Sequence, residues 1–147
     1  MHRSMDLMIA VFDSSRARIF KRESDGKIRP MSEIESGLHH FTREKVSDKA
    51  GRSFASAGDV RHAYEPKHDP HKYEKHEFVH RLARMLDLSY ERGEFGKLLL
   101  VAPKRSLGEF RNLATAKLRR CVSLEVPKDL VKYSDDELMK RVQPYLQ

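Results

Sequence analysis

The run of five apolar residues from Leu98 to Ala102 constrains the fold of this chain more than any other feature of its sequence. Such a run predicts a strand that is covered on both faces, as in the sheets of α/β proteins. Residues 6–13, which read DLMIAVFD, predict a second buried strand. The apolar part of this N-terminal run is too short to cross a bilayer, and it lacks the length and the cleavage site of a signal peptide. We therefore expect a cytoplasmic protein without membrane insertion.

Two further strands are predicted in the N-terminal third of the chain. Residues 16–22 and 27–38 alternate loosely between polar and apolar side chains. Between them lies Asp25-Gly26, the strongest hairpin signal in the sequence. Together with residues 6–13, these segments predict three antiparallel strands joined by short turns.

The first helix is predicted from about Pro70 to Arg92. Asp69 is a candidate N-cap because proline then takes the first helical position, and Gly93 is a candidate stop. Apolar side chains at three- and four-residue spacing form the stripe expected to face the core: Phe78, Leu82, Met85, Leu86 and Tyr90.

The C-terminal pattern predicts a second helix from about Leu107 to Arg119, a strand from Cys121 to Val126 and a terminal helix capped by Ser134 to Glu137. The second helix would face the core with Leu107, Phe110, Ala114 and Leu118. The complete order is βββαβαβα, which predicts one α/β domain over residues 1–147. Its mixed five-stranded sheet would be of the ribonuclease-H-like kind, with helices on its faces.

Residues 39–70 have no clear periodicity and are rich in Gly, Ser, Asp, His and Arg. A loop of this length is unusual in a compact domain, where about 4–6 residues is typical, and long loops are commonly functional or disordered. We therefore expect a functional loop.

Several histidines are candidate metal ligands, but the spacing of these histidines along the chain does not favour a metal site. His76, Glu77 and His80 match the H-E-x-x-H pattern of zinc proteases, with Glu77 as the general base. However, the two histidines lie opposite the predicted apolar stripe, and no third ligand follows at a trusted spacing. The wider candidate set matches no ligand template: His62, His68, His71, His76 and His80. We expect a solvated polar face, no bound metal and no cofactor.

A metal-dependent nuclease is a further alternative. Ribonuclease-H-like enzymes hold two metal ions with carboxylates, one of them on the first strand, and Asp13, Glu65 and Asp69 are the candidates here. Asp13 also opens a Ser-rich turn, which is an ordinary structural role for aspartate. The single cysteine, Cys121, excludes an internal disulfide framework and a Cys-rich zinc module.

Basic residues are concentrated in one segment. The formal net charge is +7, and the segment from Lys97 to Arg120 has seven basic residues against one acidic residue, Glu109. Lys104 and Arg105 follow a buried strand and precede a helix, where α/β sheets bind ligands and helix N-termini attract anions. The sequence therefore predicts either an anion or RNA-phosphate surface or an ordinary solvated helix face. The predicted binding residues are Arg52, Ser53, Ser56, Arg61, His62, Lys104, Arg105 and Arg111.

Several motifs together resemble the bacterial host attachment protein family over about residues 6–140. They begin with Asp13-Ser14-Ser15-Arg16-Ala17-Arg18-Ile19-Phe20, continue through the long loop and end after the last predicted strand. The later motifs are Gly51-Arg52-Ser53-Phe54, Ala57-Gly58, Arg61-His62-Ala63, Glu65-Pro66, Asp69-Pro70-His71, Leu99-Leu100-Val101-Ala102-Pro103, Leu107-Gly108-Glu109 and Lys128-Asp129-Leu130. His80 lies outside the family pattern.

The layout is also similar to the central domain of class-1 peptide-release factors of eukaryotes and archaea. That domain presents a Gly-Gly-Gln tripeptide from its loop to the ribosomal peptidyl-transferase centre. The corresponding segment here, from Gly51 to Gly58, contains no Gly-Gly-Gln. This resemblance therefore implies a ribosome- or RNA-binding relative without peptide-release activity.

The resulting expectation is a non-enzymatic module that binds structured RNA or the ribosome. One alternative is a direct or indirect role in attachment to host cells, as the family name implies, and another is a metal-dependent hydrolase. Exposed strand edges in a small sheet are also compatible with a homodimer.

Overall fold

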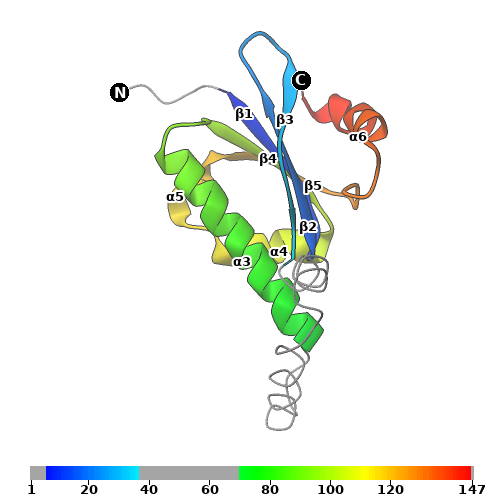
Figure 1. Ribbon diagram of the computed structural model, residues 1–147. Coiled ribbons are helices and arrows are strands. Elements are labelled where there is room, and N and C mark those ends of the chain that lie inside the picture. Colours follow the sequence, from blue (N-terminus) through cyan, green and yellow to red (C-terminus); the bar gives the residue numbers. More distant parts are fainter. Residues whose placement is uncertain (1–5, 37–69, 147) are drawn as a thin grey trace, which may run out of the picture.

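A five-stranded mixed sheet in the order β3-β2-β1-β4-β5 forms the centre of the molecule (Figure 1). The computed structural model describes residues 6–36 and 70–146. β1 pairs antiparallel with β2 and parallel with β4, while β2 and β3 are antiparallel and β4 and β5 are parallel. The predicted fold class is confirmed. The strands are β1 (Leu7–Phe12), β2 (Arg16–Arg22), β3 (Ile28–Glu35), β4 (Lys97–Ala102) and β5 (Val122–Pro127).

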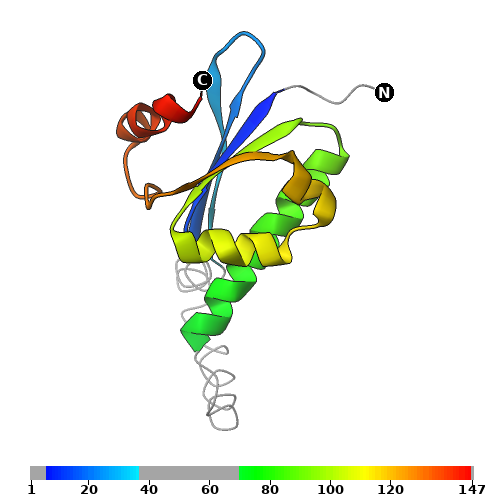
Figure 2. The ribbon, with the colours of Figure 1, turned by 180° about the vertical axis from the view of Figure 1, so that it is seen from behind.

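Helices cover both faces of the sheet, as Figures 1 and 2 show. Three of them lie on one face and α6 lies on the other. Within the two described stretches, no helix has both the length and the apolarity needed to cross a membrane. The helices are α3 (Pro70–Glu91), α4 (Lys104–Leu113), α5 (Ala116–Cys121), α6 (Asp135–Val142) and the 3-10 helix η1 (Gln143–Tyr145).

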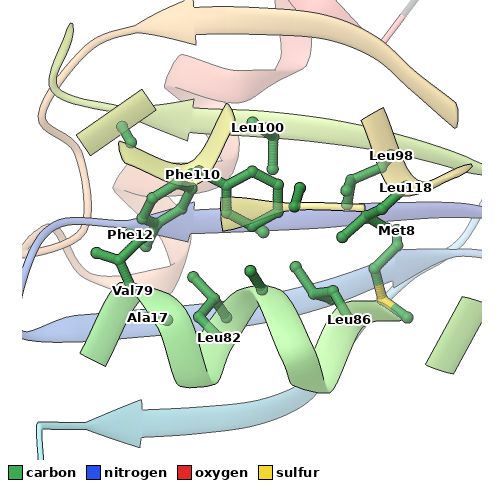
Figure 3. Packing of buried hydrophobic residues seen from close by; sticks show 14 of the residues in the cluster. Met8, Phe12, Ala17, Val79, Leu82, Leu86, Leu98, Leu100, Phe110 and Leu118 are labelled. Carbon is green, nitrogen blue, oxygen red and sulfur yellow. The ribbon is translucent and has the colours of Figure 1, made fainter. Parts of the chain in front are cut away.

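Alternate residues of β1 face the two helical layers, which explains its continuous apolar sequence. Met8 and Phe12 pack on the side of α3, α4 and α5, whereas Ile9 and Val11 pack on the side of α6. Figure 3 shows Phe12 beside Phe110 of α4, with ring centroids 5.6 Å apart. Each fully buried aliphatic or aromatic side chain of this kind contributes about 1.5–3 kcal/mol to the stability of the fold.

The predicted helix from Leu107 to Arg119 is wrong in its extent. The structure has two helices, because Ala114 is extended (φ −77°, ψ 149°) and Thr115 caps the second helix. The Thr115 hydroxyl accepts a hydrogen bond from the Leu118 amide at 3.2 Å. The four residues predicted to face the core are nevertheless buried, and Cys121 ends α5 rather than beginning β5.

The predicted stripe of α3 is correct at Phe78, Leu82 and Leu86 but wrong at Met85, which is 37% exposed. Val79 and Ala83 are buried instead. These smaller side chains extend the core-facing arc on the other side of Leu82 and Leu86, which leaves Met85 at its solvent edge. The predicted stop is confirmed, since Gly93 has φ 76° and its amide donates to the Tyr90 carbonyl at 2.9 Å.

Candidate functional site

The carboxyl ends of the parallel neighbours β1 and β4 meet at one edge of the sheet. We call this the carboxyl edge, formed by residues 13–16 after β1 and residues 103–106 after β4. From β1 the chain continues to β2 and β3 on one side, whereas β4 and β5 lie on the other. This edge is therefore a topological switch point, the place where open α/β sheets bind ligands.

Asp13 organises the first loop of the carboxyl edge. Its Oδ1 atom accepts hydrogen bonds from the Ser15 amide at 2.8 Å, the Arg16 amide at 2.9 Å and the Ser15 hydroxyl at 3.3 Å. This is an Asx-type turn, in which the carboxylate replaces backbone partners. The interpretation of Asp13 as a turn residue is confirmed, whereas Glu65 and Asp69 lie outside the described residues.

Lys104 and Arg105 occupy the first turn of α4, directly after Pro103, and both are exposed. No acidic side chain is present in that turn, and no side chain caps it. The first intrahelical hydrogen bond runs from the Leu107 amide to the Pro103 carbonyl. Amides at the start of a helix lack intrahelical acceptors and carry partial positive charge. The two cations follow β4, as predicted, but the expected helix start at about Leu107 is wrong, because α4 already begins at Lys104 and both cations belong to its first turn.

A pair of serines joins the two loops of the carboxyl edge. The hydroxyl oxygens of Ser14 and Ser106 lie 3.4 Å apart, and Ser106 is only 2% exposed. β3 also ends at the carboxyl edge, where the Ser36 amide donates to the Ser15 carbonyl at 2.8 Å. Ser14 and Ser106 were not predicted as site residues, although they lie two and four residues after the ends of buried apolar runs.

Arg111 has a different environment from Lys104 and Arg105. Its Nε lies 3.2 Å from both carboxylate oxygens of Glu125 on β5, so its charge is balanced by an acid distant in sequence. Lys117 likewise pairs with Glu91 of α3 at 3.0 Å. The basic segment is therefore less charged in the fold than its sequence indicates. The ion pairs of the described residues include none to Lys104 or Arg105.

Two buried polar atoms, one at the carboxyl edge and one further along α4, have no hydrogen-bond partner among the described residues. They are the Nε atom of Arg16 and the Oε1 atom of Glu109 on α4. Arg16 begins β2 directly after the Asp13 turn, and its Nη2 lies 3.9 Å from Glu33 of β3. Neither residue was predicted as part of the site, because sequence reasoning gave no sign that these atoms would be buried.

The predicted loop residues lie outside the described part of the chain: Arg52, Ser53, Ser56, Arg61, His62 and His68. The side chains of His71 and His76 are likewise outside it, and His80 of α3 is half-buried. In the part of the chain that the structure describes, no group of three or more His, Cys, Asp or Glu side chains is placed to hold a metal ion.

Comparisons with known proteins give one family and several distant structural likenesses. A family model described as "Protein required for attachment to host cells" matches residues 8–142. No curated protein sequence matches the chain.

Three solved structures illustrate the distant likenesses. An archaeal protein has a TM-score of 0.49 and 10% identity over 94% of this chain and 33% of its own. The archaeal translation termination factor aRF1 has a TM-score of 0.43 and 10% identity over 96% of this chain and 39% of its own. A Ppx/GppA phosphatase of Aquifex aeolicus has a TM-score of 0.41 and 15% identity over 83% of this chain and 35% of its own. The chain thus spans well under half the length of these proteins, and such distant likenesses carry no functional conclusion.

Proposed function

The chain belongs to the family of proteins required for attachment to host cells, and we propose that it is a non-enzymatic module that binds structured RNA or the ribosome. The observation that carries this proposal is the placement of Lys104 and Arg105. Both are exposed in the first turn of α4, at the edge where the ends of β1 and β4 meet. An anion at this edge would meet two side-chain cations and the positive end of a ten-residue helix.

RNA phosphates are the anionic partner that this surface favours. Exposed lysine and arginine neutralise backbone phosphates and release counterions, which supplies most sequence-independent affinity for nucleic acid. The pairing of Arg111 with Glu125 keeps that guanidinium on the sheet side of α4, so we assign it a secondary part. Lys104 and Arg105 are the primary contacts in the proposal.

The long loop supplies the remaining contacts in the proposal. Ser36, the last described residue before the loop, is held at the carboxyl edge by its hydrogen bond to Ser15. The last described residue before the loop therefore lies at the carboxyl edge. We propose that Arg52, Ser53, Ser56, Arg61 and His62 extend the same phosphate-binding surface.

Charge reversal tests the proposal. We expect Lys104→Glu/Arg105→Glu to weaken binding to a fluorescently labelled hairpin RNA and to purified ribosomes by at least about tenfold in anisotropy and sedimentation assays, because two phosphate contacts become repulsive. The neutral variant Lys104→Ala/Arg105→Ala should lower the slope of log affinity against log salt by about two.

The matched control is Lys27→Glu/Lys140→Glu, which changes the net charge equally. Lys27 is exposed at the β2–β3 hairpin, at the opposite edge of the sheet, and Lys140 is exposed on α6. This control should retain most of the affinity. Equal binding by the wild-type chain and the Lys104/Arg105 reversal, without dependence on salt, would refute the proposal.

Attachment to host cells is the second candidate function, and the description of the matched family favours it. The role is either direct, at the cell surface, or indirect, through a cytoplasmic activity such as RNA binding. Cell fractionation distinguishes these two cases. A substantial extracellular pool would favour the direct role and would count against the RNA-binding proposal.

A further inference from the structure

A second group of basic side chains surrounds an open cavity of about 320 Å³ at the amino ends of β4 and β5. We call it the amino-end cavity. It lies at the opposite end of β4 from Lys104 and Arg105, with the six-residue strand, about 20 Å long, between them. Its lining residues come from α3, the start of β4, α5 and β5: Tyr90, Gly96, Lys97, Lys117, Arg120, Cys121, Val122 and Ser123.

The charge of the amino-end cavity is strongly positive. Lys97, Lys117 and Arg120 line it, and none of its described lining residues is acidic. Glu91 balances Lys117 at 3.0 Å, whereas the ion pairs of the described residues include none to Lys97 or Arg120. Two positive charges therefore remain without a described counterion, which suits a ligand that carries two negative charges.

Neighbouring backbone donors are already in use, so side chains would recognise the ligand. The Gly96 and Lys97 amides donate to the Asp6 carbonyl at 3.0 and 3.4 Å. The Val122 amide donates to the Arg119 carbonyl, and the Ser123 hydroxyl donates to the Leu98 carbonyl at 3.3 Å. These residues therefore form no backbone nest of the kind that binds polyphosphates. A ligand would instead be recognised by the charged side chains.

We propose that the amino-end cavity binds a small phosphate monoester. A phosphate monoester carries about −1.5 to −2 charge at neutral pH, which matches the two charges of Lys97 and Arg120. The cavity volume is at the lower end of the range for small-molecule sites, about 300–1,000 Å³. Tyr90, whose ring lies 5.5 Å from that of Phe95, provides an aromatic wall for the organic part of the ester. This inference does not depend on the proposed RNA interface.

Titration of the full chain by amide NMR tests the proposal, with AMP as the monoester, inorganic phosphate as the free ion and adenosine as the uncharged control. We expect AMP to shift the amides of Gly96, Val122 and Ser123, and adenosine to leave them unchanged. Lys97→Ala/Arg120→Ala should weaken AMP binding by about tenfold or more, because two charge-assisted contacts are lost.

Two further variants locate the site and control for folding. The charge-preserving Lys97→Arg/Arg120→Lys variant should keep most of the affinity, and Lys27→Ala/Lys140→Ala, at exposed positions outside both basic sites, should bind AMP like the wild-type chain. Equal shifts with adenosine and AMP would overturn the proposal. Loss of binding in the Lys27/Lys140 variant, binding of inorganic phosphate but not AMP, or no shifts with any probe would also overturn it.

Discussion

Several side chains at the carboxyl edge form hydrogen bonds that stabilise its loops, which limits the side chains that can bind a ligand. Asp13 accepts three hydrogen bonds within its own turn, all through Oδ1, so this oxygen holds the turn together. The serines that follow connect this turn to β3 and α4, and the adjacent cations are the side chains left exposed for a ligand.

We expect Asp13→Ala to lower the free energy of unfolding by about 1–2 kcal/mol, because two turn amides lose their acceptor. Asp13→Asn should cost much less, since the amide oxygen accepts the same hydrogen bonds. Urea unfolding monitored by circular dichroism measures both. An Asp13→Asn variant as unstable as Asp13→Ala would contradict the turn role, because it would show that stability depends on the negative charge of Asp13 and not on its hydrogen bonds.

Arg18 is the buried cation that attaches α6 to the sheet. It is 6% exposed on β2, and its Nη1 donates to the carbonyls of Val131, at 3.1 Å, and of Tyr133. Its Nη2 pairs with Asp135 in the first turn of α6, and its Nε lies 3.6 Å from Glu33. One side chain thus fixes the segment that leads from β5 to the last helix.

Replacing Arg18 by methionine keeps an unbranched side chain but removes every donor. We expect a loss of about 2–3 kcal/mol in the free energy of unfolding, because carbonyls at a buried position lose charged donors. Asp135→Asn should cost less than about 1 kcal/mol, since that carboxylate is largely exposed. Thermal and urea unfolding compare the two. Equal losses would show that the ion pair, rather than the carbonyl contacts, holds α6.

At the level of elements, the sequence predicted every strand of the sheet, and the errors have local causes. Apolar runs and the Asp25-Gly26 turn determine β1, β2, β3 and β4 because each depends on neighbouring residues alone. The break between α4 and α5 was missed because Ala114 and Leu118 continue the helical spacing of buried residues across it. Only the extended backbone of Ala114 reveals that Thr115 caps a new helix.

The break gives a prediction for Thr115. Its hydroxyl accepts from the Leu118 amide and donates to Asp87 of α3 at 2.8 Å. We expect Thr115→Ala to lower the free energy of unfolding by about 1 kcal/mol, the usual cost of removing an N-cap. Thr115→Ser, which keeps the hydroxyl, should remain close to the wild-type value in urea unfolding. A stable Thr115→Ala variant would show that α5 needs no cap.

At the scale of the whole molecule, charge placement was only partly predictable. The sequence correctly placed Lys104 and Arg105 after β4, because the end of an apolar run is a local feature, but it began the following helix about three residues too late. It overestimated the free charge of the basic segment, because Glu91 and Glu125 reach Lys117 and Arg111 from distant elements. The fold therefore separates the cations into two exposed sites, the carboxyl edge and the amino-end cavity.

Capture of cellular partners tests the central claim, that the carboxyl edge binds RNA, most directly. Tagged wild-type chain, Lys104→Glu/Arg105→Glu and Lys27→Glu/Lys140→Glu are expressed at equal levels in bacterial cells, and the RNA retained with each is sequenced and quantified. We expect enrichment of structured or ribosomal RNA with the wild-type chain and with Lys27→Glu/Lys140→Glu, and its loss with Lys104→Glu/Arg105→Glu. Equal RNA recovery with all three chains, or no enrichment over an untagged control, would contradict the claim.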